Sequence, residues 1–152
     1  MAHQLWLLRH GEAEPHDARP DHDRRLTPRG EDQSRAAGRA LAALQIEFQA
    51  VFTSPKVRAL DTARLACEAL GVEPIVDDSL ASGFDERAAR ELAAAGDRVL
   101  VVGHEPDFSQ VVHDITGARV ELKKGGLAGL RITGPGEVLV VLRPRELDRI
   151  RP

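Results

Sequence analysis

The chain has 152 residues, a typical length for one domain, and its 21 Lys and Arg against 24 Asp and Glu leave a net charge of −3 at pH 7. No overall basic field therefore indicates binding to nucleic acid or to an anionic membrane. The single cysteine, Cys67, excludes an internal disulfide and a cysteine-based zinc cluster. The N-terminus lacks the features of a signal peptide, and no apolar run approaches the roughly 20 residues of a membrane helix. We expect a single cytoplasmic domain spanning residues 1–152.

The first predicted element is a buried strand at residues 4–8 that ends in Arg9 and His10. A short apolar run closed by a glycine is typical of a central strand covered on both faces. Gly11 is expected to let the backbone turn sharply and to expose its N–H to an anion. Because ligands bind beyond the carboxyl ends of strands in open α/β sheets, we expect Arg9 and His10 at such an edge.

A polar stretch without apolar periodicity follows at residues 12–25 and is expected to form a loop beside the site. Thr27 and Pro28 are typical of a helix N-cap and first helical position. The apolar spacing after them predicts a helix that runs to about Leu44.

A second short strand is predicted at residues 50–53, followed by Ser54 and Pro55, which repeat the cap-plus-proline signal of a helix start. On this helix, Arg58 lies near the N-terminus. Cys67 shares the apolar face, so it is expected to be a small core residue and not a nucleophile.

The rest of the chain continues to alternate strands and helices. The expected elements are an edge strand at 72–76, a loop at 77–84, a surface helix at 85–95, a strand at 98–103, a helix after Pro106, an antiparallel hairpin of residues 127–132 and 138–142, and one helical turn within 143–152. The strand at 98–103 ends, like the first one, in a glycine and a histidine, His104. We therefore expect a mostly parallel sheet with an antiparallel edge.

Three strand ends thus carry Arg9 with His10, Ser54 with Arg58, and His104, and the steps from His10 to Arg58 to His104 are 48 and 46 residues. In parallel α/β packing these ends meet at one edge, where helix N-termini favour anions. Two arginines can bind phosphoryl oxygens bidentately. One imidazole can attack phosphorus and hold the phosphoryl group covalently, while the other donates hydrogen bonds or exchanges a proton. The set predicts a two-step phosphoryl transfer that needs no metal and no cofactor.

Three segments resemble the three motifs of the histidine phosphatase superfamily, and together they cover nearly the whole chain. They are Leu8 to Glu12, which contains the RHG triplet, Thr53 to Ala63, and Val102 to Pro106. The resemblance implies a phosphoglycerate-mutase-like fold, a three-layer α/β/α sandwich with a mostly parallel mixed sheet.

The resemblance also implies roles for individual residues. His10 would be the phosphorylated nucleophile, Arg9 and Arg58 the phosphate ligands, and His104 the second histidine of the pocket. Together with Gly11 and Ser54, Arg9, Arg58 and His104 are expected to contact the substrate.

Within this superfamily the short chain looks most like the SixA-type protein histidine phosphatases, which remove phosphate from phosphohistidine on signalling proteins. Only 46 residues separate Arg58 from His104, which leaves room for a minimal cap over the site. An open site suits a protein substrate. Relatives with a large cap also bring a carboxylic acid that protonates an alcohol leaving group, whereas a P–N bond needs that acid less.

Two alternatives remain from the sequence. The first is a phosphatase of the same superfamily that acts on a small phosphorylated metabolite, a sugar phosphate or a nucleotide. It requires a nearby proton donor, for which the candidates are Glu12, Asp77, Asp78, Asp85, Glu86 and Glu105. The second is a phosphate-binding domain without catalysis, in which one of the four central residues would be misplaced.

The remaining histidines have no metal-ligand spacing, so no metal site is expected. They are His3, His16, His22 and His113, all expected in polar, terminal or surface positions. Lys123 and Lys124 begin a glycine-rich turn and are expected to be surface charges, with contact to the substrate as the alternative.

Overall fold

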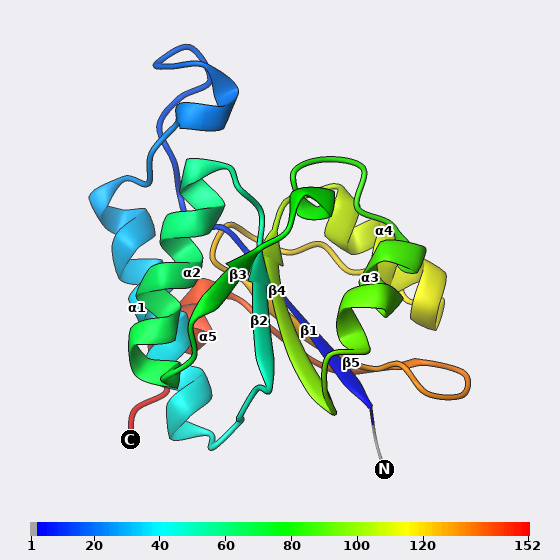
Figure 1. Ribbon diagram of the computed structural model, residues 1–152. Coiled ribbons are helices and arrows are strands. Elements are labelled where there is room, and N and C mark those ends of the chain that lie inside the picture. Colours follow the sequence, from blue (N-terminus) through cyan, green and yellow to red (C-terminus); the bar gives the residue numbers. More distant parts are fainter. Residues whose placement is uncertain (1–2) are drawn as a thin grey trace.

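A six-stranded mixed sheet forms the centre of the protein in the computed structural model, which describes residues 3–152 (Figure 1). The strands are β1 (Gln4–Arg9), β2 (Ala50–Thr53), β3 (Pro74–Val76), β4 (Arg98–Gly103), β5 (Leu127–Arg131) and β6 (Glu137–Leu142), in the spatial order β3-β2-β4-β1-β5-β6. The first four strands run parallel, and β5 and β6 pair antiparallel at one side. The predicted mostly parallel sheet with an antiparallel hairpin is confirmed.

Helices cover both faces of this sheet, which gives the predicted three-layer α/β/α sandwich (Figure 1). On one side lie α1 (Pro28–Ala43), α2 (Val57–Leu70) and α5 (Pro144–Leu147), and on the other lie α3 (Glu86–Ala93) and α4 (Asp107–Thr116). The chain also forms two short 3-10 helices, η1 (Asp21–Asp23) and η2 (Asp78–Leu80). Within residues 3–152, no helix is both long and apolar enough to cross a bilayer.

Strand β1 contributes to the apolar cores on both sides of the sheet. Leu5 and Leu7 pack in the core beneath α3 and α4, whereas Trp6 and Leu8 pack in the core beneath α1 and α2. Successive side chains of a strand point to opposite faces, so an uninterrupted apolar run is what a doubly covered strand requires. All four side chains are at most 5% exposed.

The helix start signals were predicted correctly at α1 and placed too early at α2. At α1, Thr27 is the N-cap, its hydroxyl accepts from the N–H of Gly30 at 3.1 Å, and Pro28 occupies the first turn. At α2, the helix begins at Val57, and Ser54 is not its cap. The hydroxyl of Ser54 instead accepts from the N–H of Lys56 at 3.2 Å, which stabilises the turn before the helix.

Close backbone packing joins β1 to α1 at the start of the polar loop. A Cβ added to Gly11 would lie 2.5 Å from the carbonyl oxygen of Gly30, so neither side of this contact leaves room for a side chain. Gly11 has no positive φ, so its backbone conformation does not itself require glycine; what the structure adds to the predicted reason, a sharp turn, is the close approach to α1.

The remaining predictions of local structure are largely confirmed. The edge strand is shorter than predicted, since only Pro74–Val76 pairs with β2. Cys67 is buried in the core beside α1, and burial raises the pKa of its thiol to about 11, so it is unreactive. The C-terminal segment forms the expected helical turn, α5, whose Leu147 is fully buried. The polar loop of residues 12–25 contains η1 and an isolated bridge between Ala13 and Leu26.

Candidate active site

The carboxyl ends of β1, β2 and β4 bring the predicted residues together at one edge of the sheet. The spatial order β2-β4-β1 places these parallel strands side by side, so His10, Ser54 and His104 follow neighbouring strands. The ring centroids of His10 and His104 are 5.2 Å apart. A cavity of about 340 Å³, whose lining includes Arg9, His10, Arg58 and His104, opens at this edge. The four central residues of the prediction therefore share one cavity, which we call the catalytic cavity.

His10 is held in the tautomer that a nucleophile requires. Its Nδ1 lies 2.7 Å from the carbonyl oxygen of Gly11, and because a carbonyl oxygen only accepts, Nδ1 must carry the proton. Nε2 is then left with a free lone pair. Burial is the main reason that the pKa of His10 is lowered to about 3, and nearby cations, Arg58 first among them, act in the same direction. The ring is therefore neutral at pH 7.

His104 has one ring nitrogen bound and the other available. Its Nε2 lies 2.8 Å from the hydroxyl of Ser54, while its Nδ1 is buried and has no hydrogen-bond partner among residues 3–152. Buried polar atoms without a partner are rare in proteins, and at a functional site such an atom indicates where a ligand binds. Burial, followed by the neighbouring His10, lowers the pKa of His104 to about 3.

Both arginines line the cavity, and each is anchored by a backbone carbonyl. Arg9 donates through Nη1 to the carbonyl of Leu122 at 2.8 Å, and Arg58 donates through Nη1 to the carbonyl of Asp21 at 2.7 Å. The Nε–H of each guanidinium is buried without a partner in the described part of the chain. Both side chains thus retain a donor that an oxyanion would satisfy.

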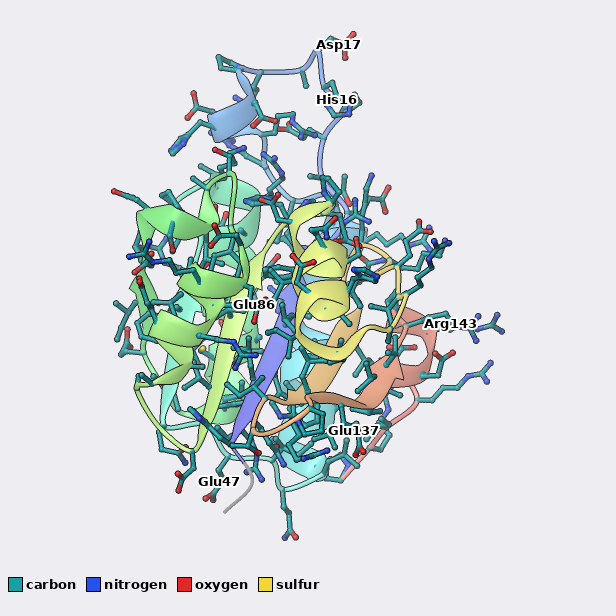
Figure 2. All side chains as sticks on the ribbon, turned by 90° about the vertical axis from the view of Figure 1, so that its right-hand side faces the viewer. His16, Asp17, Glu47, Glu86, Glu137 and Arg143 are labelled. Atoms are coloured by element: carbon teal, nitrogen blue, oxygen red, sulfur yellow. The ribbon has the colours of Figure 1, made fainter. Side chains whose placement is uncertain are left out.

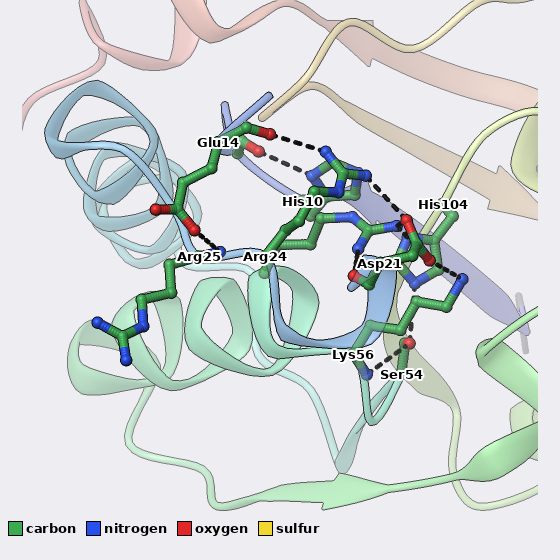
Figure 3. Close-up of polar contacts among 10 residues, drawn as sticks. His10, Glu14, Asp21, Arg24, Arg25, Ser54, Lys56 and His104 are labelled. Carbon is green, nitrogen blue, oxygen red and sulfur yellow. Dashed lines mark hydrogen bonds and ion pairs between the residues drawn. The ribbon is translucent and has the colours of Figure 1, made fainter. Parts of the chain in front are cut away.

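An ion-pair cluster that the sequence did not reveal closes one wall of the catalytic cavity (Figure 3). The carboxylate of Asp21, on η1, lies 2.9 Å from Lys56 Nζ, 3.0 Å from Arg24 Nη2 and 3.3 Å from Arg58 Nη2. The hydrogen bond from Lys56, and then that from Arg24, hold the pKa of Asp21 well below its usual range. The loop of residues 12–25 is therefore attached to the site by charge.

Comparison with known proteins identifies the family. Residues 5–95 match the sequence model of the histidine phosphatase superfamily, branch 1. The chain belongs to this superfamily. An uncharacterised protein of Picosynechococcus is 36% identical in an alignment of 139 residues that covers 84% of this chain and 84% of that protein.

Solved structures of histidine phosphatases share the fold. The protein histidine phosphatase SixA complexed with tungstate is 24% identical, covers 95% of this chain and 99% of its own, and superposes with a TM-score of 0.84. A mycobacterial glucosyl-3-phosphoglycerate phosphatase is 17% identical, covers 94% of this chain and all of its own, and has a TM-score of 0.73. The predicted phosphoglycerate-mutase-like architecture is confirmed.

The six carboxylates considered as proton donors for this histidine phosphatase are all committed elsewhere or lie away from the catalytic cavity. Asp77 accepts from the N–H of Ser79, Asp85 caps α3 at the N–H of Ala88, Glu86 pairs with Arg90, Glu12 lies 3.7 Å from Arg29, and Asp78 is exposed. Only Glu105 lines the cavity, and its two oxygens accept from the N–H groups of Ser109 at 2.7 Å and Leu122 at 3.1 Å. Glu105 therefore fixes the segment that anchors Arg9.

Two residues predicted to contact substrate have other partners. The N–H of Gly11 donates to the hydroxyl of Thr62 at 3.1 Å, so it is not free to bind an anion. Ser54 is fully buried and does not line the cavity, because its hydroxyl is directed to His104. In this histidine phosphatase, the hydroxyl of Ser54 thus contacts the His104 ring directly. The expected contacts of both residues with substrate therefore stay predictions, and each polar group has a partner within the fold.

The other histidines lie outside the pair at the centre of the site. His16 lies near the tip of the projecting loop of residues 12–25, beside Asp17, and reaches the outer rim of the catalytic cavity (Figure 2). His22 is exposed on η1, His113 lies 3.6 Å from Asp114, and Nε2 of His3 contacts the carbonyl of Ala93. No group of three potential metal-ligating side chains occurs in residues 3–152.

Proposed function

We propose that this protein is a phosphohistidine phosphatase that acts through a phospho-His10 intermediate. One observation supports this choice of substrate within the superfamily: no carboxylic acid among residues 3–152 is poised to protonate a leaving group in the catalytic cavity. Of the three carboxylates in its lining, Asp21 is held by cations, Glu105 by two backbone amides, and Asp107 accepts from the N–H of Phe84 at 3.3 Å. An alcohol leaves poorly without an acid, whereas the imidazole of phosphohistidine is a much better leaving group.

In the first step, Nε2 of His10 attacks phosphorus and the P–N bond of the substrate breaks. The electron pair of that bond leaves with the substrate's imidazole nitrogen, and because the other ring nitrogen carries a proton, the leaving group departs as a neutral imidazole that needs no acid. The free donors of Arg9 and Arg58 stabilise the negative charge on the phosphoryl oxygens. Nδ1 of His104, which has no partner among residues 3–152, can form a hydrogen bond with the phosphoryl group or with the leaving nitrogen.

In the second step, water attacks the phosphorus of phospho-His10 and the bond to Nε2 breaks, which releases inorganic phosphate and restores the neutral ring. His104 is suited to take the proton from this water and pass it to solvent, because its ring is neutral and its centroid is 5.2 Å from that of His10. The fold shared with the SixA protein histidine phosphatase supports the same assignment.

Trapping of the intermediate tests this function. A phosphohistidine peptide labelled with ³²P is mixed with the protein and quenched within milliseconds. We expect an acid-labile, base-stable label on His10 that is absent in His10→Ala and accumulates in His104→Gln. Label on a different residue, or turnover that survives His10→Ala, would show that the mechanism is wrong.

A second candidate is a phosphatase for a small phosphorylated metabolite. It is favoured by the walls that the loop of residues 12–25 and residues 81–83 add to the catalytic cavity, whose volume of about 340 Å³ suits a small ligand. The fold shared with the glucosyl-3-phosphoglycerate phosphatase agrees with it. We expect kcat/KM to be at least about 100-fold higher on a phosphohistidine peptide than on sugar phosphates, because only the latter need an acid. The reverse order would favour the metabolite.

A further inference from the structure

A second and larger cavity adjoins the catalytic one. It has a volume of about 770 Å³, and we call it the basic groove after the charges in its lining, which are Arg29, Lys123, Lys124, Arg143 and Arg145 against Glu12, Asp32 and Asp148. Lys124 lines both cavities, so the groove begins where the catalytic cavity ends. The lining comes from α1, from the turn before β5 and from the segment around α5, together with Glu12 from the segment after β1.

The excess of positive charge is local, because the chain as a whole carries a net charge of −3. Arg29 lies 3.7 Å from Glu12, and Arg143 and Arg145 share Glu146 at 2.9 Å and 3.9 Å. Figure 2 shows Arg143 extending outward from the side of the molecule. Lys123 and Lys124 are exposed and take part in none of the ion pairs formed within residues 3–152. The protein has only three lysines, and two of them lie here.

A cavity of similar size elsewhere shows that an excess of cationic side chains is not a general property of the protein's cavities. The cavity beside α3 has a volume of about 680 Å³ and an acidic lining. It contains Arg87 and Arg90 against Asp85, Glu86, Glu91 and Asp114. The excess of cations is therefore found at the groove that opens into the active site.

Backbone hydrogen bonds hold the two lysines in a fixed position relative to the nucleophile. The N–H of Gly125 donates to the carbonyl oxygens of Arg9 at 3.1 Å and His10 at 2.8 Å, and the N–H of Arg9 donates to the carbonyl of Gly126 at 3.0 Å. The turn that displays Lys124 is thus bonded directly to the end of β1. A partner bound to these lysines would be held in register with the ring of His10.

We propose that the basic groove is the docking surface for an acidic face of the protein that carries the phosphohistidine. This inference rests on the proposed function and names the surface that recognises the substrate. The phosphoryl group of the substrate binds in the catalytic cavity alone. A substrate that also contacts the residues around α5 must therefore be much larger than the phosphoryl group. Positive charge along that path is complementary to acidic side chains, and such complementarity chiefly sets association rate and specificity.

The test compares two synthetic peptides with the same central phosphohistidine, one flanked by glutamates and the other by glutamines, and free phosphohistidine as a third substrate. For the unaltered protein at low salt, we expect kcat/KM to be about 10-fold higher for the glutamate peptide. In Lys123→Glu combined with Arg145→Glu this preference should disappear or reverse. Hydrolysis of free phosphohistidine should change less than about 2-fold, which also shows that the variant is folded.

The control is Arg87→Glu in the acidic cavity beside α3, which should keep the full preference for the glutamate peptide. Equal rates on both peptides for the unaltered protein would overturn the docking proposal. An equal loss on all three substrates in the groove variant would also overturn it, because the lysine and arginine would then act on the phosphoryl group itself. If the unaltered protein hydrolyses none of the three, it is the proposed function that fails.

Discussion

Acidification should destabilise this protein through its two buried, neutral histidines. The pKa values of His10 and His104 are lowered from 6.5 to about 3, chiefly by burial. Below pH 6.5 the unfolded chain therefore binds two protons that the folded protein excludes, and the stability falls as the pH decreases. At pH 5 the difference is about 2 kcal/mol for each ring, or about 4 kcal/mol for the pair. The loss continues until the pH approaches 3, where the folded protein also takes up protons.

Urea unfolding at pH 7 and at pH 5, followed by circular dichroism, measures this effect. The free energy of unfolding should fall by about 4 kcal/mol more for the unaltered protein than for His10→Gln combined with His104→Gln, which has no ring to protonate. The matched control, His16→Gln combined with His22→Gln, replaces two exposed rings and should behave like the unaltered protein. The same pH dependence with and without the buried pair would refute the reasoning.

Three further substitutions test individual contacts. Ser54→Ala removes the partner of His104, so kcat should fall about 10-fold with KM nearly unchanged in steady-state assays; an unchanged kcat would contradict a positioning role. Asp21→Asn removes the carboxylate that lies 3.3 Å from Arg58 and competes with an anion for its guanidinium. The inhibition constant of inorganic phosphate should therefore decrease about 5-fold. An increase would show that Asp21 assists anion binding. Gly11→Ala places a Cβ 2.5 Å from a carbonyl oxygen of α1. The free energy of unfolding, measured by thermal unfolding, should therefore decrease by about 2 kcal/mol. An unchanged melting temperature would show that the backbone relaxes at no cost.

The sheet and the central site residues could be predicted because their signals are local. A histidine directly follows β1 and another directly follows β4, and the cap at Thr27 is predicted from neighbouring residues. Parallel packing then brings His10 and His104 to the same edge without further information. The order and identity of the motifs were sufficient for the family.

Features that depend on contacts between distant segments could not be predicted. The polar loop of residues 12–25 has no periodicity, so nothing in it indicated that Asp21 would bind Lys56 and Arg58. Gly11 was recognised as special, but its partner lies on α1, and the hydroxyl that takes its N–H lies on α2. Ser54 appeared at a helix start, and only the structure shows that its hydroxyl reaches a ring 50 residues away.

His10 follows β1, a central strand whose side chains lie in both apolar cores. Leu5 and Leu7 pack in one core, and Trp6 and Leu8 pack in the other. Strand β1 therefore cannot detach unless the helices on both faces also separate from the sheet. Amide hydrogens of β1 should therefore exchange with solvent deuterium only by global opening. His10 consequently has no local route to disorder, and thermal inactivation of this enzyme should coincide with loss of the whole tertiary structure.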